Sequence, residues 1–139
     1  MNRITQTTST AIVRLNLVNL VNPVQYCYSM TPELFREIIA AYQSHGWELR
    51  RVLLKPPTRS DLSEQAVGLF DEAKLIDSDI DALWFARPSH AGREAWELRL
   101  VAEQPYALFE AFEAHETEEE REEARIEMQN KMRDHQTQT

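Results

Sequence analysis

The sequence predicts an α+β domain. We expect a sheet of about five antiparallel or mixed strands, two amphipathic helices that cover it, and a long charged C-terminal helix. Three observations lead to this prediction. A helical apolar stripe, a glycine and a strand pattern follow one another in residues 31–54, and an alternating hairpin pattern occupies residues 82–101. After residue 114 the chain turns into a run of glutamates among good helix formers.

The first thirty residues contain two strand patterns after a polar start. Residues 1–10 are polar and unpatterned, and we expect them to be disordered. Apolar and polar side chains alternate over residues 11–20 and again over residues 24–30, with a break at Asn22-Pro23 between them. These two segments predict a pair of strands.

Residues 31–54 predict one capped helix followed directly by a strand. Thr31 can accept a hydrogen bond from a free N–H of the first turn, and Pro32 suits the first helical position. Gly46 can take the left-handed conformation that ends a helix, and residues 47–54 then form a strand that stops at a proline pair. Apolar residues recur at helical spacing and predict a buried face made of Leu34, Phe35, Ile38, Ile39, Ala41 and Tyr42.

These residues also carry a resemblance. A helix closed by Gly-Trp-Glu-Leu at residues 46–49, with a later apolar strand around Leu-Trp-Phe at residues 83–85, resembles small bacterial domains of unknown function. The resemblance implies a compact module in which a helix packs on a sheet. It brings no catalytic residues with it.

The middle of the chain predicts a second helix and a hairpin. Residues 56–59 are expected as a loop. Asp61 and Glu64 then form a start similar to a capping box, and apolar spacing extends this helix to near Ile76. Residues 77–81 form a turn, residues 82–86 a strand, and residues 94–101 the return strand.

The end of the chain predicts a long helix that opens at Pro105. Leu108, Phe109 and Phe112 are its apolar anchor, and Ala124, Met128 and Met132 return later at a spacing of four residues. We therefore divide the chain into residues 1–10, a domain of residues 11–114, and an acidic helical extension of residues 115–139 that leaves the body. On this division, truncation after Ala114 should leave the domain folded.

Charge and cysteine content restrict the function. The net charge is -8, and residues 113–139 hold 4 Lys/Arg against 9 Asp/Glu, a balance of -5. Such a segment disfavours nucleic acid as a ligand, because phosphates require lysine and arginine. Cys27 stands alone, so no internal disulfide forms. The apolar run of residues 11–21 is too short to span a bilayer, and we expect a cytoplasmic protein without membrane contact.

Two motifs for metal binding or catalysis are present only in part. Asp77, Asp79 and Asp81 have the spacing that opens a calcium loop, but Ala82 and Pro88 stand where its glycine and glutamate belong. His115-Glu116 begins like a zinc-protease helix, but Glu119 occupies the position of the second histidine. We therefore predict no catalytic residues, no metal and no cofactor.

One set of residues could bind an anionic ligand. Arginines and tryptophans fall on strands that we expect to be neighbours, and together they could form a cationic and aromatic patch. The alternative is a sheet rim on which the arginines pair with Glu48, Glu94 and Glu97. The candidate ligand-binding residues are Trp47, Arg51, Arg87, Trp96 and Arg99.

The sequence therefore favours a non-catalytic protein-interaction module that associates with itself. Large apolar side chains exceed what two short helices cover, which predicts a homodimer through the sheet. The acidic C-terminal helix predicts a basic protein partner. The alternative is a small-molecule binding domain for an anionic ligand, or a small enzyme, that uses the Trp/Arg patch. The residues behind the dimer prediction are Tyr26, Tyr28, Trp84, Phe85 and Trp96.

Overall fold

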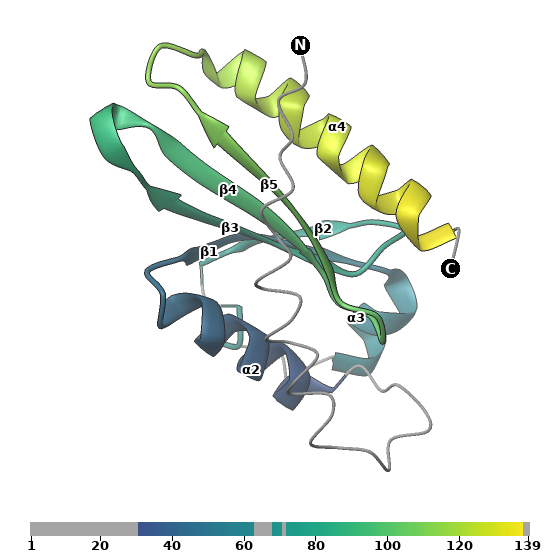
Figure 1. The fold of residues 1–139 in the computed structure, drawn as a ribbon. Coiled ribbons are helices and arrows are strands. Elements are labelled where there is room, and N and C mark those ends of the chain that lie inside the picture. Colours follow the sequence, from purple (N-terminus) through teal and green to yellow (C-terminus); the bar gives the residue numbers. More distant parts are fainter. Residues whose placement is uncertain (1–30, 63–67, 71, 138–139) are drawn as a thin grey trace.

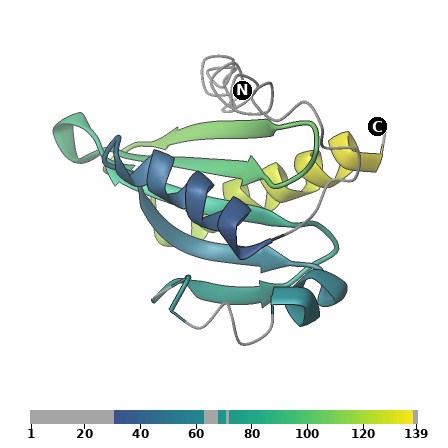
Figure 2. The same ribbon diagram turned by 90° about the horizontal axis from the view of Figure 1, so that it is seen from below.

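The computed structural model describes residues 31–62, 68–70 and 72–137 (Figure 1). The disordered start and the two strands predicted before residue 31 lie outside the described residues. Within the described part, a five-stranded sheet lies between α2 on one face and α4 on the other (Figures 1 and 2). The elements are α2 Pro32–Gln43, β1 Glu48–Leu54, α3 Pro56–Leu62, β2 Lys74–Asp77, β3 Ala82–Pro88, η2 His90–Gly92, β4 Glu94–Leu100, β5 Tyr106–Phe112 and α4 Glu118–Thr137.

The sheet is mixed, which confirms the predicted α+β class with its long charged C-terminal helix. Its strand order is β2-β1-β3-β4-β5. β1 pairs with β2 in parallel and with β3 antiparallel, and β3, β4 and β5 continue as antiparallel neighbours. Because side chains alternate along each strand, each strand contributes to both faces of the sheet.

Helix α2 and its connection to β1 confirm the local prediction. The Thr31 hydroxyl accepts a hydrogen bond from Leu34 N at 3.2 Å, and Gly46 has a φ of 86°. Trp47 N donates to Tyr42 O at 3.1 Å and Gly46 N to Gln43 O at 3.0 Å, which is the hydrogen-bond pair of a Schellman motif. This motif turns the chain sharply, so that β1 begins close to the end of α2.

Each helix buries a different core against the sheet. On the α2 face, the Tyr42 ring stacks on Phe85 with ring centroids 3.9 Å apart, and Phe35 meets Phe70 edge to face. On the α4 face, Trp84 and Trp96 lie edge to face beneath the buried Met128 and Met132. The α2 core contains mainly Phe35, Ile38, Ile39, Tyr42, Val52, Leu54, Leu83 and Phe85.

The helix predicted over residues 61–76 is wrong in its described C-terminal part, while residues 63–67 and 71 lie outside the described residues. Residues 56–59, expected as a loop, begin helix α3, because a proline is tolerated in a first turn that needs no N–H donor. Helix α3 covers Pro56–Leu62, Gly68 has a φ of 83°, and Lys74–Asp77 form β2 alongside β1. Parallel pairing with β1 therefore decides the structure of a segment whose apolar spacing also suits a helix.

The helix predicted to open at Pro105 is also wrong at its start. Residues Tyr106–Phe112 form strand β5 against β4, and α4 begins only at Glu118. Thr117 caps α4: its hydroxyl accepts from Glu120 N at 3.1 Å, while Glu120 Oε1 accepts from Thr117 N at 2.9 Å. Nor does α4 leave the body, because Met128 and Met132 are fully buried in the core.

Candidate functional site

The five candidate ligand residues lie on both faces of the sheet. Arg51 and Trp96 are on the α4 face, where Trp96 belongs to the core under α4. Trp47 and Arg87 are on the α2 face, with the Arg87 guanidinium carbon 5.3 Å from the Trp47 ring centroid. Arg99 alternates with core residues of the α4 face, so its buried side chain lies on the α2 face. The structure therefore forms two separate pairs from these candidates, Arg51 with Trp96 on the α4 face and Arg87 with Trp47 on the α2 face.

A β-bulge in β1 places a second arginine beside Arg51. The register with β3 shifts between Leu49 and Arg51, which leaves Arg50 as an extra residue on this strand. Both guanidinium carbons consequently lie near the same indole, at 5.3 Å for Arg50 and 5.7 Å for Arg51 from the Trp96 ring centroid. The bulge is what allows two consecutive residues of a strand to reach one aromatic side chain.

Helix α4 adds two arginines from the opposite side. The Arg125 guanidinium carbon lies 4.3 Å from the Trp96 ring centroid, and its side chain is only 1% exposed. Arg121, one turn earlier, donates to Glu94 Oε1 at 3.2 Å and to Glu113 O at 2.8 Å. We call Arg50, Arg51, Arg121 and Arg125 with Trp96 the arginine cluster.

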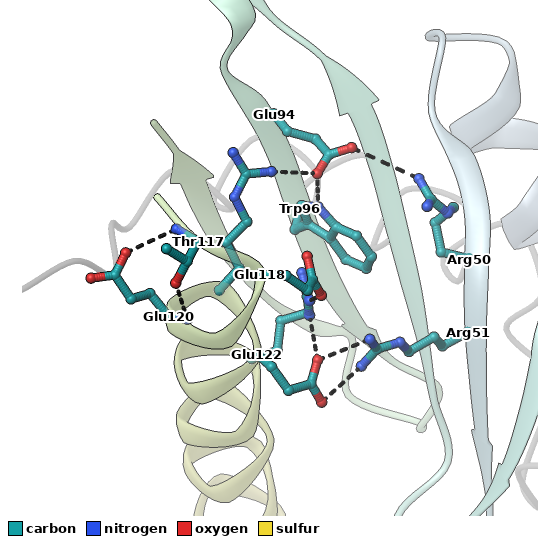
Figure 3. Close-up of polar contacts among 10 residues, drawn as sticks. Arg50, Arg51, Glu94, Trp96, Thr117, Glu118, Glu120 and Glu122 are labelled. Carbon is teal, nitrogen blue, oxygen red and sulfur yellow. Dashed lines mark hydrogen bonds and ion pairs between the residues drawn. The ribbon is translucent and has the colours of Figure 1, made fainter. Parts of the chain in front are cut away.

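Carboxylates from β4 and α4 connect the arginine cluster. Glu122 accepts two hydrogen bonds from Arg51, at 2.9 and 3.3 Å, and one from Arg125 Nε at 3.0 Å (Figure 3). Glu94 accepts from Trp96 Nε1 at 2.8 Å, and Glu118 accepts from Arg125. Paired forks of this kind are the strongest form of guanidinium–carboxylate contact. The sheet and α4 are therefore joined by charged groups at this end of the helix.

The pKa of Glu122 reflects these contacts. Partial burial raises the pKa of its carboxyl, but the hydrogen bonds from Arg51 and Arg125 outweigh burial, so the pKa lies below its ordinary value of 4.5. Glu122 is therefore ionised at neutral pH. Its carboxylate acts toward Arg51 and Arg125 as a bound anion would.

The sequence predicts the strand part of the arginine cluster but not the helix part. Arg50 belongs to the densest positive stretch of the sequence although it is not one of the five candidate ligand residues, whereas Arg121 and Arg125 fall in a helix that was expected to leave the body. A signal was present: Glu118 with Glu122 and Arg121 with Arg125 are each four residues apart, which places each pair on one stretch of the helix surface. The bulge at Arg50 depends on strand pairing and left no trace in the sequence.

The three aspartates of the calcium-like motif each bind different partners. Asp77 accepts from Arg59 at 2.7 Å and Asp79 from Arg133 at 2.6 Å. Buried Asp81 accepts from Lys55 N at 2.8 Å and from Thr58 Oγ1 at 2.9 Å. These side chains join loops and helices to the sheet. Within the described ranges, no group of three His, Cys, Asp or Glu side chains is arranged to hold a metal ion.

The outward face of α4 carries a hollow of about 370 Å³. Ile126 lies on it and is 48% exposed, which makes it one of two exposed large apolar side chains in the described part of the chain, with Leu75 on β2 at 37%. Three glutamates surround this isoleucine. The described residues that line the hollow are Glu120, Glu123, Ala124, Ile126, Glu127 and Asn130.

Comparison of the chain with family models, curated proteins and solved structures finds no significant match. Among the described residues, none of the helices has both the length and the apolar character needed to cross a membrane.

Proposed function

We propose that the protein is a non-catalytic interaction module whose acidic α4 surface receives a basic, amphipathic protein segment. One observation carries this proposal: the hollow on the outward face of α4 combines an exposed isoleucine with glutamates on its rim. An apolar contact surrounded by charge is the usual anatomy of a protein-binding patch. The inner face of α4 is committed to the sheet, so the outward face is the part that a partner can reach.

The charges specify the partner. Glu123 and Glu127 are four residues apart and both are exposed, so they present negative charge along one edge of the hollow. A partner helix with lysines or arginines at the same spacing, and one apolar residue between them, would complement both features. Charge of this kind mainly accelerates association and excludes acidic partners, while the isoleucine contact contributes to affinity. We place this module in the cytoplasm, consistent with its single cysteine.

Self-association remains part of the proposal, but its original reason does not hold for the described side chains; Tyr26 and Tyr28 lie outside the described residues. Trp84, Phe85 and Trp96 were expected to be exposed on the sheet, and they are at most 4% exposed because α2 and α4 cover the two faces. Among the described residues, Leu75 on the short edge strand β2 is the large apolar side chain exposed for a sheet-edge contact. Sedimentation of wild type and Leu75→Lys tests this directly: a dimer should become a monomer in the variant, and a monomeric wild type refutes it.

The partner proposal can be tested with a synthetic amphipathic peptide that carries lysines on one face and leucines on the other. Nuclear magnetic resonance should show shifts concentrated on α4, with binding that weakens as salt is added. Glu123→Gln with Glu127→Gln should weaken binding several-fold, and Ile126→Ser should do the same without changing the charge.

A matched control separates a specific patch from general acidity. Glu33→Gln with Glu37→Gln removes two charges from exposed positions on α2, on the opposite side of the sheet. This control should bind the peptide as wild type does. Equal weakening by both double variants would show that the peptide senses only net charge, and the proposed patch would be wrong.

A further inference from the structure

The arginine cluster has the composition of an oxyanion site that is already filled from within the chain. Glu122 gives its two carboxylate oxygens to three guanidinium hydrogen bonds, two from Arg51 and one from Arg125. Several convergent guanidinium groups are the usual protein recognition element for phosphate, because their planar forks match its oxygens. The bulge that brings Arg50 beside Arg51 concentrates this positive charge further.

We propose that the arginine cluster is a binding site for a phosphate group, and that Glu122 of α4 occupies it as an internal competitor. A phosphate dianion carries more charge and more acceptor oxygens than the single carboxylate it would replace. The site would take free phosphate or the phosphate group of a monoester. This proposal does not depend on the partner surface, which lies on the outward face of α4.

Several side chains of the site are partly exposed to solvent. The Glu122 side chain is 41% exposed and the Arg51 side chain is 21% exposed, so the carboxylate can leave toward water without unfolding the helix. Arg50 is 42% exposed and approaches Glu48 and Glu94 only at 3.8 and 3.9 Å, beyond hydrogen-bond length. Its guanidinium therefore has donors to offer to an incoming anion.

The remaining arginines and Trp96 hold the site in shape. Arg125 is 1% exposed, and its Nη1 has no acceptor among the described residues. The Trp96 indole lies within 6 Å of three guanidinium carbons, at the distances already given, and its own N–H is fixed by Glu94. Favourable contacts between guanidinium groups and an indole face keep like charges close together, a prerequisite for a multidentate anion site.

The test is phosphate titration of the full chain at constant ionic strength, with chloride as the balancing anion. The Trp96 indole N–H resonance reports on the site. Wild type should bind inorganic phosphate weakly, because only molecules in which Glu122 has left are competent. Glu122→Gln keeps the shape and removes the charge of the competitor, so we expect the apparent affinity to rise by about tenfold.

Two arginine variants in the Glu122→Gln background separate a site from general charge. Arg50→Gln should lose most of the gain in affinity. Arg133→Gln is the matched control, because Arg133 lies on the same helix as Glu122 but binds Asp79 away from the cluster. This control should bind phosphate as tightly as Glu122→Gln alone does. Unchanged affinity in Glu122→Gln, or equal losses in both arginine variants, would overturn the proposal.

Two further measurements complete the design. Should Glu122→Gln fail to unfold cooperatively, the comparison of wild type with Arg50→Gln alone gives the answer, because Arg50 is exposed and its loss leaves the core intact. Methyl phosphate in place of inorganic phosphate distinguishes the source of the ligand. Binding of both identifies a monoester as an acceptable ligand, whereas binding of inorganic phosphate alone restricts the site to the free ion.

Discussion

The two faces of the sheet hold their helices by different interactions. Helix α2 buries Phe35, Ile38, Ile39 and Tyr42, an apolar stripe that packs mainly on apolar and aromatic strand residues, and the Tyr42 hydroxyl donates a hydrogen bond to the buried Glu97 of β4. More than half of the 20 residues of α4 are charged, and its buried apolar residues are Ala124, Met128 and Met132. It reaches the sheet through guanidinium and carboxylate groups around Trp96 as well as through these three side chains.

This difference matters for what each helix can do. Apolar burial of the kind seen at α2 offers no charge that a small anion could screen or replace, so this helix is a fixed part of the core. Charged contacts at a half-exposed site contribute modestly to stability and respond to ionic conditions. The α4 face is consequently the face where binding can compete with an internal contact.

The largest expected effect comes from removal of α4. Truncation after Ala114 would expose Trp84, Trp96 and Leu98, which are at most 4% exposed in the full chain. We expect loss of cooperative unfolding, measured by circular dichroism during heating, which reverses the expectation drawn from the sequence alone. Cooperative unfolding at an unchanged midpoint would show instead that α4 is peripheral and that the two faces differ more than we infer.

The next effect compares single anchors of the two helices. Phe35→Ala should lower the free energy of unfolding by about 3–5 kcal/mol, and Met128→Ala by about 2–5 kcal/mol, because both side chains are fully buried. Urea denaturation measures both, with exposed Glu37→Ala and Glu127→Ala as controls on the same helices. A negligible loss for Met128→Ala would mean that charge alone holds α4.

A smaller effect isolates the charged contact. Arg51→Gln should cost about 1 kcal/mol at low salt, because the pair with Glu122 is partly exposed on both sides. The loss should shrink as sodium chloride is added, whereas the loss for Phe35→Ala should not. A double-mutant cycle with Glu122→Gln assigns the coupling to this pair. A salt-independent loss would indicate that the Arg51 stem contributes through packing.

Local signals explain the parts of the fold that the sequence predicted. Thr31 and Gly46 act within a few residues of their own position, so the start and the end of α2 could be read directly. The hairpin of β3 and β4 joins neighbours in the chain, and the sequence of its return strand β4 alternates cleanly. By contrast, β2 and β5 are strands because of the partners they pair with, and their apolar spacing fits a helix equally well.

The candidate site was predictable only in part, for the same reason. Trp96 and Arg51 were selected as an aromatic and cationic pair, and they do lie together. The sequence could not show that Trp47, Arg87 and Arg99 lie on the other face of the sheet. The face of each residue depends on the strand register and on the bulge at Arg50. The glutamates that fill the site belong to α4, whose polar sequence hides its contact with the sheet.

The smallest expected effect is a pair of opposite pH dependences, one near the α4 contact and one at the end of β1. The lowered pKa of Glu122 means that its contribution to stability is present above 4.5 and is lost as the pH falls through its folded pKa. Burial raises the pKa of Asp81 above its ordinary 3.8, against the hydrogen bonds from Lys55 and Thr58. Its contribution is therefore present at low pH and is lost as the pH rises through its folded pKa.

Urea denaturation at pH values between about 3 and 7, a range that includes the ordinary carboxyl pKa values, measures the two pH dependences separately. The stability of wild type should fall as the pH is lowered and Glu122 becomes protonated, and this fall should be absent in Glu122→Gln. Protonation of Asp81 favours the folded state, so it should add stability to wild type as the pH is lowered. This added stability should be absent in Asp81→Asn. Difference curves that slope in the same direction would contradict this assignment. If both curves slope as expected for Asp81, Glu122 is not held by Arg51 and Arg125 in solution, and the contrast between the two faces then rests on apolar packing alone.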